Sequence, residues 1–127
     1  MGGAKAAPKE RAGPAMSGVP PLTSVRLRRA LRLLIRRGTA RGDEVARFMS
    51  MHRRTLNRRL KAEGTTFRAM LDEVRFELAR DMLADSSISI VDVGTALGYA
   101  DPSAFTRAFR RWAGTPPARW RAGARHD

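Results

Sequence analysis

Apolar residues recur at helical intervals in short segments that end at glycines, and this pattern constrains the fold of the 127-residue chain most strongly. In SVRLRRALRLLIRRG, Leu27, Leu31 and Leu34 are three or four residues apart, with Ile35 beside them and arginines around the rest. This spacing predicts an amphipathic helix that stops near Gly38. The chain has room for one domain, or for two very small lobes that share a core. We therefore expect an all-α fold.

A pair of short helices follows. The segment EVARFMSMHRRTLNRRLKAEG contains a short helix, a few interrupting residues that include Ser50, and a second helix that ends at Gly64. The inward positions are predicted to be Val45, Phe48 and Met49 on the first helix and Leu56 and Leu60 on the second. Such a pair is too small to be stable alone.

The longest periodic segment comes next, and it predicts a helix from about Phe67 to Asp85. At roughly 1.5 Å per residue this helix spans about 28 Å, which is long enough to hold two lobes apart. Its apolar positions include Phe67, Leu71, Val74, Leu78 and Leu83.

The helical pair then returns in SISIVDVGTALGYADPSAFTRAFRRWAG. A turn at Gly98 separates the two helices, and Asp101 is expected to cap the second, whose first turn tolerates Pro102. A short closing helix with Trp120 follows in TPPARWRAG. The predicted core positions are Ile90, Val93 and Leu97 on the first helix and Phe105, Phe109 and Trp112 on the second.

The charge of the chain indicates its class of partner. Lysine and arginine total 25 against 12 acidic residues, a formal net charge of +13, which favours a polyanion. Arginine supplies most of the positive charge. This preference suits forked hydrogen bonds to phosphates and guanine edges, although a GC-rich genome would also raise the arginine content.

Other functional classes find little support. The chain has no cysteine and two histidines, so we expect no disulfide, metal site or cofactor. No nucleophile, base and orienting group form a recognisable set, so an enzyme is the least favoured interpretation. No stretch resembles a signal peptide or spans a bilayer, so we expect a cytoplasmic protein without membrane contact.

The second helix of each pair carries the candidate DNA contacts. Apolar side chains anchor one face, and the opposite face can enter the major groove of B-DNA, where arginine and asparagine suit guanine and adenine. An ordinary solvated face is the alternative for each single arginine. The base-contact candidates are Arg54, Asn57, Arg58, Ser103, Thr106 and Arg107, and the phosphate-contact candidates are His52, Arg53, Arg59, Lys61, Arg110 and Arg111.

From about Val25 to Gly123 the chain resembles the DNA-binding domain of the AraC/XylS family of bacterial transcription regulators. The strongest match lies in IVDVGTALGYADPSAFTRAFRRWAGTPPARWR. The matching residues are Ile90, Val93, Ala96, Gly98, Tyr99, Phe105, Arg107, Phe109, Gly114, Pro116, Pro117, Trp120 and Arg121.

The resemblance implies about seven helices that form two helix-turn-helix lobes joined by a long linker helix, with a recognition helix of each lobe in adjacent major-groove segments of double-stranded DNA. The base-contact candidates fall at the corresponding family positions. The predicted organisation is a flexible tail at 1–21, a DNA-binding domain at 22–123 and a tail at 124–127. Within the domain, lobe one covers about 24–64, the linker helix about 67–85 and lobe two about 88–122.

This chain departs from the family pattern at three places. His52 stands where a capping Ser or Thr is common, and Ser50 replaces a frequent turn glycine. Pro102 and Ala104 cannot bond a base through their side chains, so the second lobe is expected to read fewer bases.

The resemblance also implies partners outside this stretch. Most members carry an N-terminal effector-binding or dimerisation domain, and activators contact RNA polymerase. The chain is then either part of a longer regulator, which we favour, or a small member without such a domain. A related branch that repairs alkylated DNA is excluded because it needs a reactive cysteine.

Two other interpretations compete with that of a sequence-specific transcription regulator. A non-specific basic nucleic-acid-binding protein, architectural or RNA-associated, would explain the charge but not the paired turns. A basic amphipathic segment on a membrane surface would explain Val25 to Arg37 but not the aromatic second half.

Overall fold

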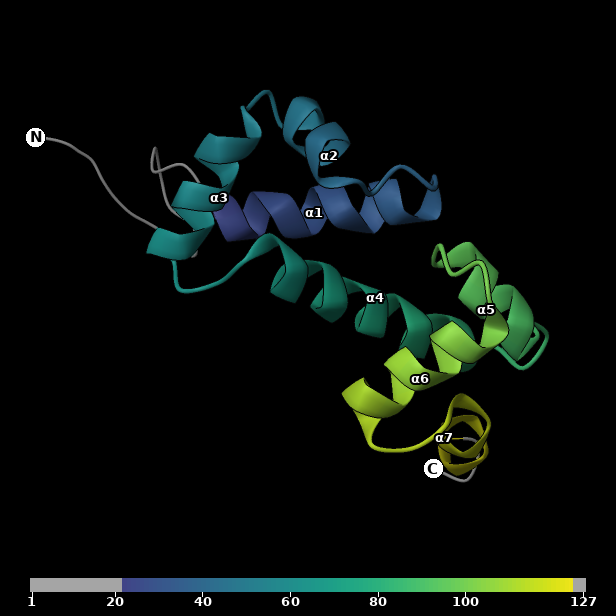
Figure 1. Cartoon of the computed structure of the whole chain (residues 1–127). Coiled ribbons are helices and arrows are strands. Elements are labelled where there is room, and N and C mark those ends of the chain that lie inside the picture. Colours follow the sequence, from purple (N-terminus) through teal and green to yellow (C-terminus); the bar gives the residue numbers. More distant parts are fainter. Residues whose placement is uncertain (1–21, 125–127) are drawn as a thin grey trace, which may run out of the picture.

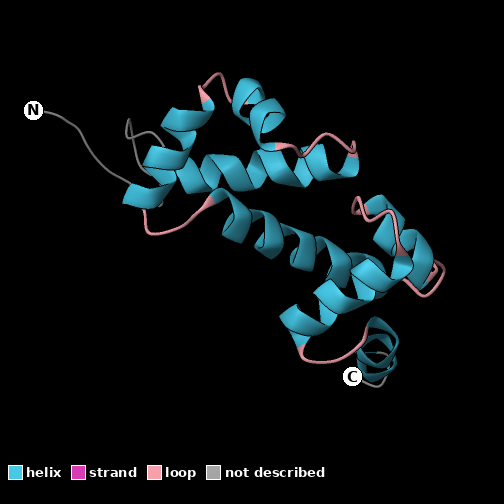
Figure 2. Ribbon diagram, viewed as in Figure 1, coloured by secondary structure: helices cyan, strands magenta, loops and turns pink. Residues whose placement is uncertain are grey.

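A computed structural model describes residues 22–124, which form seven α-helices and no strand (Figures 1 and 2). The tail predicted at 1–21 lies outside the described residues. Of the tail predicted at 124–127 only Ala124 is described, and it is the last residue of α7. The helices are α1 (Thr23–Arg36), α2 (Gly42–Phe48), α3 (Arg53–Ala62), α4 (Phe67–Leu83), α5 (Ile90–Ala96), α6 (Pro102–Ala113) and α7 (Pro117–Ala124). The predicted all-α class is therefore confirmed.

The long helix α4 joins two helix-turn-helix lobes. In the first lobe α1 packs along α4 and also contacts α2 and α3, and in the second lobe α5 packs on α4, α6 on α5, and α7 on α6 (Figure 1). Val74 and Leu78 of α4 are fully buried and belong to one continuous core that reaches both lobes. Each lobe thus uses α4 as one wall.

Ion pairs fasten α1 to α4 on the outer side of this core. Arg28 pairs with Glu73 and Glu77, and Arg32 pairs with Glu77 at 3.0 Å and with Asp81 at 3.4 Å. The partners recur every four residues on both helices, so one arginine stripe faces one acidic stripe. The hydrogen bond to Glu73, opposed by burial, is the main reason that the pKa of Arg28 lies above its usual value.

Aromatic packing fastens the second lobe. Phe105 and Phe109 of α6 are buried, and Phe109 contacts Phe76 of α4 with ring centroids 5.7 Å apart. Trp112 extends this cluster at 5.9 Å from Phe76, and Trp120 of α7 closes it at 6.0 Å from Phe109. The predicted anchoring of α6 by its aromatic face is confirmed, with Trp112 only half-buried.

One predicted core position is wrong. Phe48 was expected to face inward beside Val45 and Met49, but its side chain is 52% exposed. The buried face of α2 consists of Val45, Ala46 and Met49. At roughly 100° per residue, Ala46 falls inside this stripe and Phe48 falls beyond its edge. On a helix of seven residues, the size and apolar character of Phe48 were therefore not sufficient to predict which face of α2 is buried.

The long helix ends two residues before the predicted Asp85. Asp85 instead forms a local turn, in which its Oδ1 accepts hydrogen bonds from the backbone N–H of Ser87 at 3.0 Å and from the Ser87 hydroxyl at 2.7 Å. These bonds lower the pKa of Asp85, against a smaller opposing effect of burial. An aspartate that bonds the backbone two residues ahead favours a turn over a helix.

Candidate nucleic-acid interface

Helix α3 presents a polar face opposite its buried one. Leu56 and Leu60 are fully buried, and α3 contacts α1 and α2, which fixes the rotation of α3 about its axis. The base-contact candidates Arg54, Asn57 and Arg58 are all exposed. The phosphate-contact candidates in this part of the chain are also exposed. They are His52, directly before the helix, and Arg53, Arg59 and Lys61 on it. The fold thus gathers six of these residues on the accessible surface of α3 and places His52 directly before it.

The start of α3 lacks side-chain capping. The side chain of His52 accepts no hydrogen bond from a backbone N–H group in the described part of the chain, in keeping with its place where a capping Ser or Thr is common. The first N–H groups of α3 are therefore open to an external acceptor. Positive partial charge at this end favours an anion such as a DNA phosphate.

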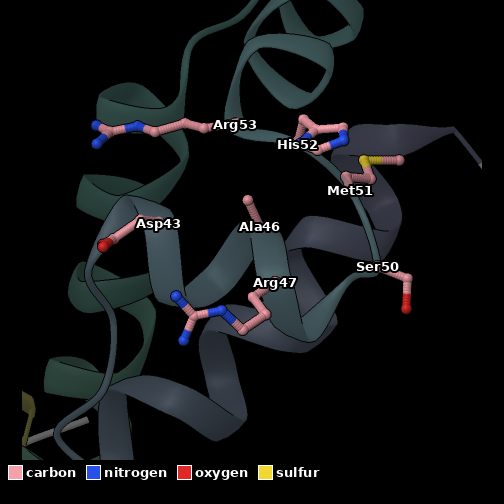
Figure 3. Close-up of a pocket in the computed structure, with 7 residues that line it drawn as sticks. All are labelled: Asp43, Ala46, Arg47, Ser50, Met51, His52 and Arg53. Carbon is pink, nitrogen blue, oxygen red and sulfur yellow. The ribbon is translucent and has the colours of Figure 1, made fainter.

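A hollow of about 430 Å³ lies between α2 and the start of α3 (Figure 3), and the acidic Asp43 is one of the residues that line it. Arg47 of α2 lines it together with His52 and Arg53. The guanidinium of Arg53 lies so close to Gly42 that a Cβ atom on Gly42 would be 2.6 Å from Arg53 Cζ. Sequence reasoning missed Arg47, because no spacing within α2 distinguishes it from a solvated arginine.

The turn before α3 has a strained residue. Ser50 has φ = 59°, in the left-handed region that glycine adopts without penalty, and it is the only non-glycine residue with positive φ within residues 22–124. The serine noted in the sequence in place of a turn glycine therefore adopts the conformation of the glycine. The analogous position in the second lobe is Gly98, with φ = 95°.

Helix α6 has a side-chain cap, which α3 lacks, and it offers fewer long polar side chains. Asp101 accepts a hydrogen bond from the backbone N–H of Ser103 at 2.9 Å, and Pro102 occupies the first turn, as predicted. Ser103 and Arg107 are exposed, and Thr106 is partly exposed. Arg110 and Arg111 are exposed nearer the end of the helix.

Arg75 connects the linker helix with the turn that precedes α6. Its guanidinium lies 5.1 Å from the ring centroid of Tyr99, a distance suited to a cation–π contact. Burial raises the pKa of Tyr99, while the positive charge of Arg75 acts in the opposite direction. The phenol therefore stays protonated at neutral pH.

The comparisons with known proteins agree with this geometry. A family model described as a helix-turn-helix domain matches residues 45–123. An HTH-type transcriptional regulator of Mycobacterium tuberculosis is 46% identical over 77 residues, which are 61% of this chain and 22% of that protein. VirS of the same species is 35% identical over 91 residues, which are 72% of this chain and 27% of VirS. The chain therefore spans about a quarter of the length of these curated relatives.

Solved structures share the arrangement of helices. The transcriptional regulator CdpR from Pseudomonas aeruginosa is 40% identical with a TM-score of 0.72, and the match covers 79% of this chain and 31% of CdpR. The C-terminal domain of AraT, a response regulator from Geobacillus stearothermophilus, is 25% identical with a TM-score of 0.71, and the match covers 84% of this chain and 88% of that domain.

Fold and surface define a DNA-binding domain with two helix-turn-helix lobes. The chain belongs to the AraC-type helix-turn-helix family of transcription regulators. No helix among residues 22–124 is long and apolar enough to cross a membrane.

Proposed function

We propose that the chain reads a specific sequence of double-stranded DNA by placing α3 and α6 in adjacent major-groove segments. The observation that carries the proposal is the repeated arrangement of a helix with a buried apolar face and an exposed polar face, once at each end of α4. With 17 residues, α4 is about 26 Å long. Successive major grooves on one DNA face lie about 34 to 36 Å apart, a separation that two lobes packed beyond the helix ends can reach.

The two recognition helices have unequal roles in this proposal. Arg54, Asn57 and Arg58 give α3 three side chains with donors for base edges, and the two arginines are long. In α6, Ser103 and Thr106 are short, so Arg107 carries most of the base reading. His52, Arg53, Arg59, Lys61, Arg110 and Arg111 bind phosphates and supply affinity that depends on salt.

The function requires DNA binding and no catalysis, in keeping with relatives that are named as transcription regulators. Because those relatives are about four times longer than the matched part, we propose that an effector-binding or dimerisation domain acts together with this domain in the complete regulator. RNA polymerase is a further proposed partner. A DNA-reading regulator of bacterial type acts in the cytoplasm, which is therefore the proposed location.

Selection of binding sites from a random duplex pool, with excess competitor DNA at about 0.15 M salt, tests the proposal. Enrichment of two short elements about one helical turn apart would support reading by both lobes. Enrichment of a single element would restrict base reading to one lobe. Tight binding at low salt without any enrichment would favour the non-specific basic nucleic-acid-binding protein.

Two substitutions separate base contacts from phosphate contacts. Arg58→Ala and Arg107→Ala should each weaken binding to the selected site by about 1 to 3 kcal/mol and relax base choice locally. An equal loss on unrelated duplexes would identify phosphate contacts instead.

A further inference from the structure

The first helix begins without a cap of its own. The side chain of Leu22, which precedes α1, is apolar and cannot accept a hydrogen bond. The first turn of α1 contains no acidic residue. The first N–H groups of a helix need acceptors from elsewhere when they are not satisfied by solvent. Thr23 at this position is buried, so water has little access to it.

A distant carboxylate satisfies these groups. Glu63 Oε2 accepts a hydrogen bond from the backbone N–H of Thr23 at 2.8 Å, and Glu63 Oε1 accepts one from Ser24, also at 2.8 Å. Both oxygens of one carboxylate are therefore used on consecutive N–H groups. The negative charge also lies at the positive end of the dipole of α1.

Glu63 is the residue directly after α3, so this contact joins the end of one candidate recognition helix to the start of α1. Leu56 and Leu60 fix the rotation of α3, but apolar contacts are non-directional and oppose sliding along its axis less strictly than hydrogen bonds do. The directed hydrogen bonds of Glu63 oppose such sliding. Because Arg28 and Arg32 hold α1 on α4, the position of α3 is connected through α1 to the linker helix.

We infer that Glu63 is a positioning residue for DNA reading, which holds α3 on α1 so that Asn57 and Arg58 meet base edges in register with the second lobe. The inference rests on the proposed function. Glu63 itself is a poor DNA contact, since its carboxylate would repel phosphates. Removal of Glu63 therefore has opposite effects in the two possible roles. If Glu63 positions α3, its removal weakens specific binding. If it is an ordinary surface acid, its removal strengthens binding to any DNA.

Two variants with the same charge change distinguish these roles. Glu63→Gln keeps one oxygen that can accept a hydrogen bond, and Glu63→Ala keeps none. We expect the ratio of affinities for the selected site and an unrelated duplex to fall by about tenfold in Glu63→Ala and by less in Glu63→Gln. Equal changes in both variants, or tighter binding to both duplexes, would show a charge effect alone and overturn the inference.

Glu44→Gln and Glu44→Ala are the matched controls, because Glu44 is an acid of α2 in the same lobe. They should leave the affinity ratio within about twofold. Circular dichroism of each variant at the temperature of the binding assay ensures that folded proteins are compared.

A measurement without DNA separates this inference from the proposed function. In amide NMR spectra, Glu63→Ala should shift the signals of Thr23 and Ser24. It should also shift the signals of α3 from the end of the helix back to Asn57. Shifts confined to Thr23, Ser24 and the mutated residue would overturn the positioning role even if the wild-type chain selects a DNA site. Shifts through α3 in a chain that selects no site would keep the positioning role and reject sequence-specific reading.

Discussion

Gly94 of α5 lies so close to Phe105 of α6 that a Cβ atom on Gly94 would be 3.0 Å from both Cβ and Cγ of the phenylalanine. Phe105 is 1% exposed and contacts Tyr99 and Phe109, so it has little room to move. The two helices of the second lobe can approach to this distance because residue 94 has no side chain.

Gly94→Ala should therefore destabilise the domain by about 1 to 3 kcal/mol through overpacking, although alanine is the better helix former. Gly123→Ala in α7 is the matched control, because among the described residues its Cβ would have no neighbour within 4 Å other than adjacent residues and the backbone of its own helix. The control should be neutral or slightly stabilising. Urea denaturation measures both, and a Gly94→Ala variant as stable as wild type would contradict the close approach.

Ser50→Gly should stabilise the domain by about 1 kcal/mol, because glycine adopts the positive φ of this turn without steric penalty. Ser50→Ala retains the Cβ atom and should give no such gain. Thermal denaturation of the two variants tests the difference. If glycine and alanine behave alike at this position, the strain is not a property of the folded chain in solution.

Arg121→Ala should destabilise the domain by about 1 to 3 kcal/mol. Arg121 Nε donates a hydrogen bond to the carbonyl of Leu83 at 2.8 Å, and Arg121 Nη2 donates to that of Asp85 at 3.3 Å, so the side chain satisfies acceptors at the end of α4. Arg119→Ala, at an exposed position of the same helix, is the control and should change stability by less than about 0.5 kcal/mol. Equal urea midpoints for the two variants would exclude the capping role.

Acid should remove the contribution of Glu63 to stability. Burial raises its pKa, but the hydrogen bonds from Ser24 and Thr23 together outweigh burial and lower the pKa below its usual value. A group with a lowered pKa in the folded state stabilises fully above its unfolded pKa of about 4.3, and this contribution is lost as the pH falls through the folded pKa. The stability difference between wild type and Glu63→Gln should thus shrink from pH 6 to pH 3. A constant difference in urea titrations would argue against ionised Glu63 as the cap of α1.

Sequence spacing was sufficient to predict the helices and most of the core, because intervals of three and four residues directly give one face of a helix. The error at Phe48 has the same origin. On a helix of only seven residues, spacing alone cannot say which of two neighbouring stripes faces inward, and the identity of the packing partner decides.

Contacts between distant segments could not be predicted in this way. Glu63 and Thr23 are 40 positions apart, and Arg28 and Glu77 are 49 apart, so no local pattern connects them. The outward orientation of Arg58 and Arg107 followed from helical spacing, because each lies on the side opposite a buried stripe. Their contacts with bases depend on DNA and remain predictions.

The shared helix α4 sets an angle between the lobes as well as a distance. Each residue of an α-helix advances the chain by about 1.5 Å and turns it by about 100°. One residue inserted in the middle of α4 would barely lengthen it but would rotate the second lobe around the axis, away from the groove that we propose α6 enters. Only insertions close to a whole number of turns would preserve this phase. In the proposed function, the spacing of the two DNA elements is therefore tied to the helical repeat of the protein as well as to that of DNA.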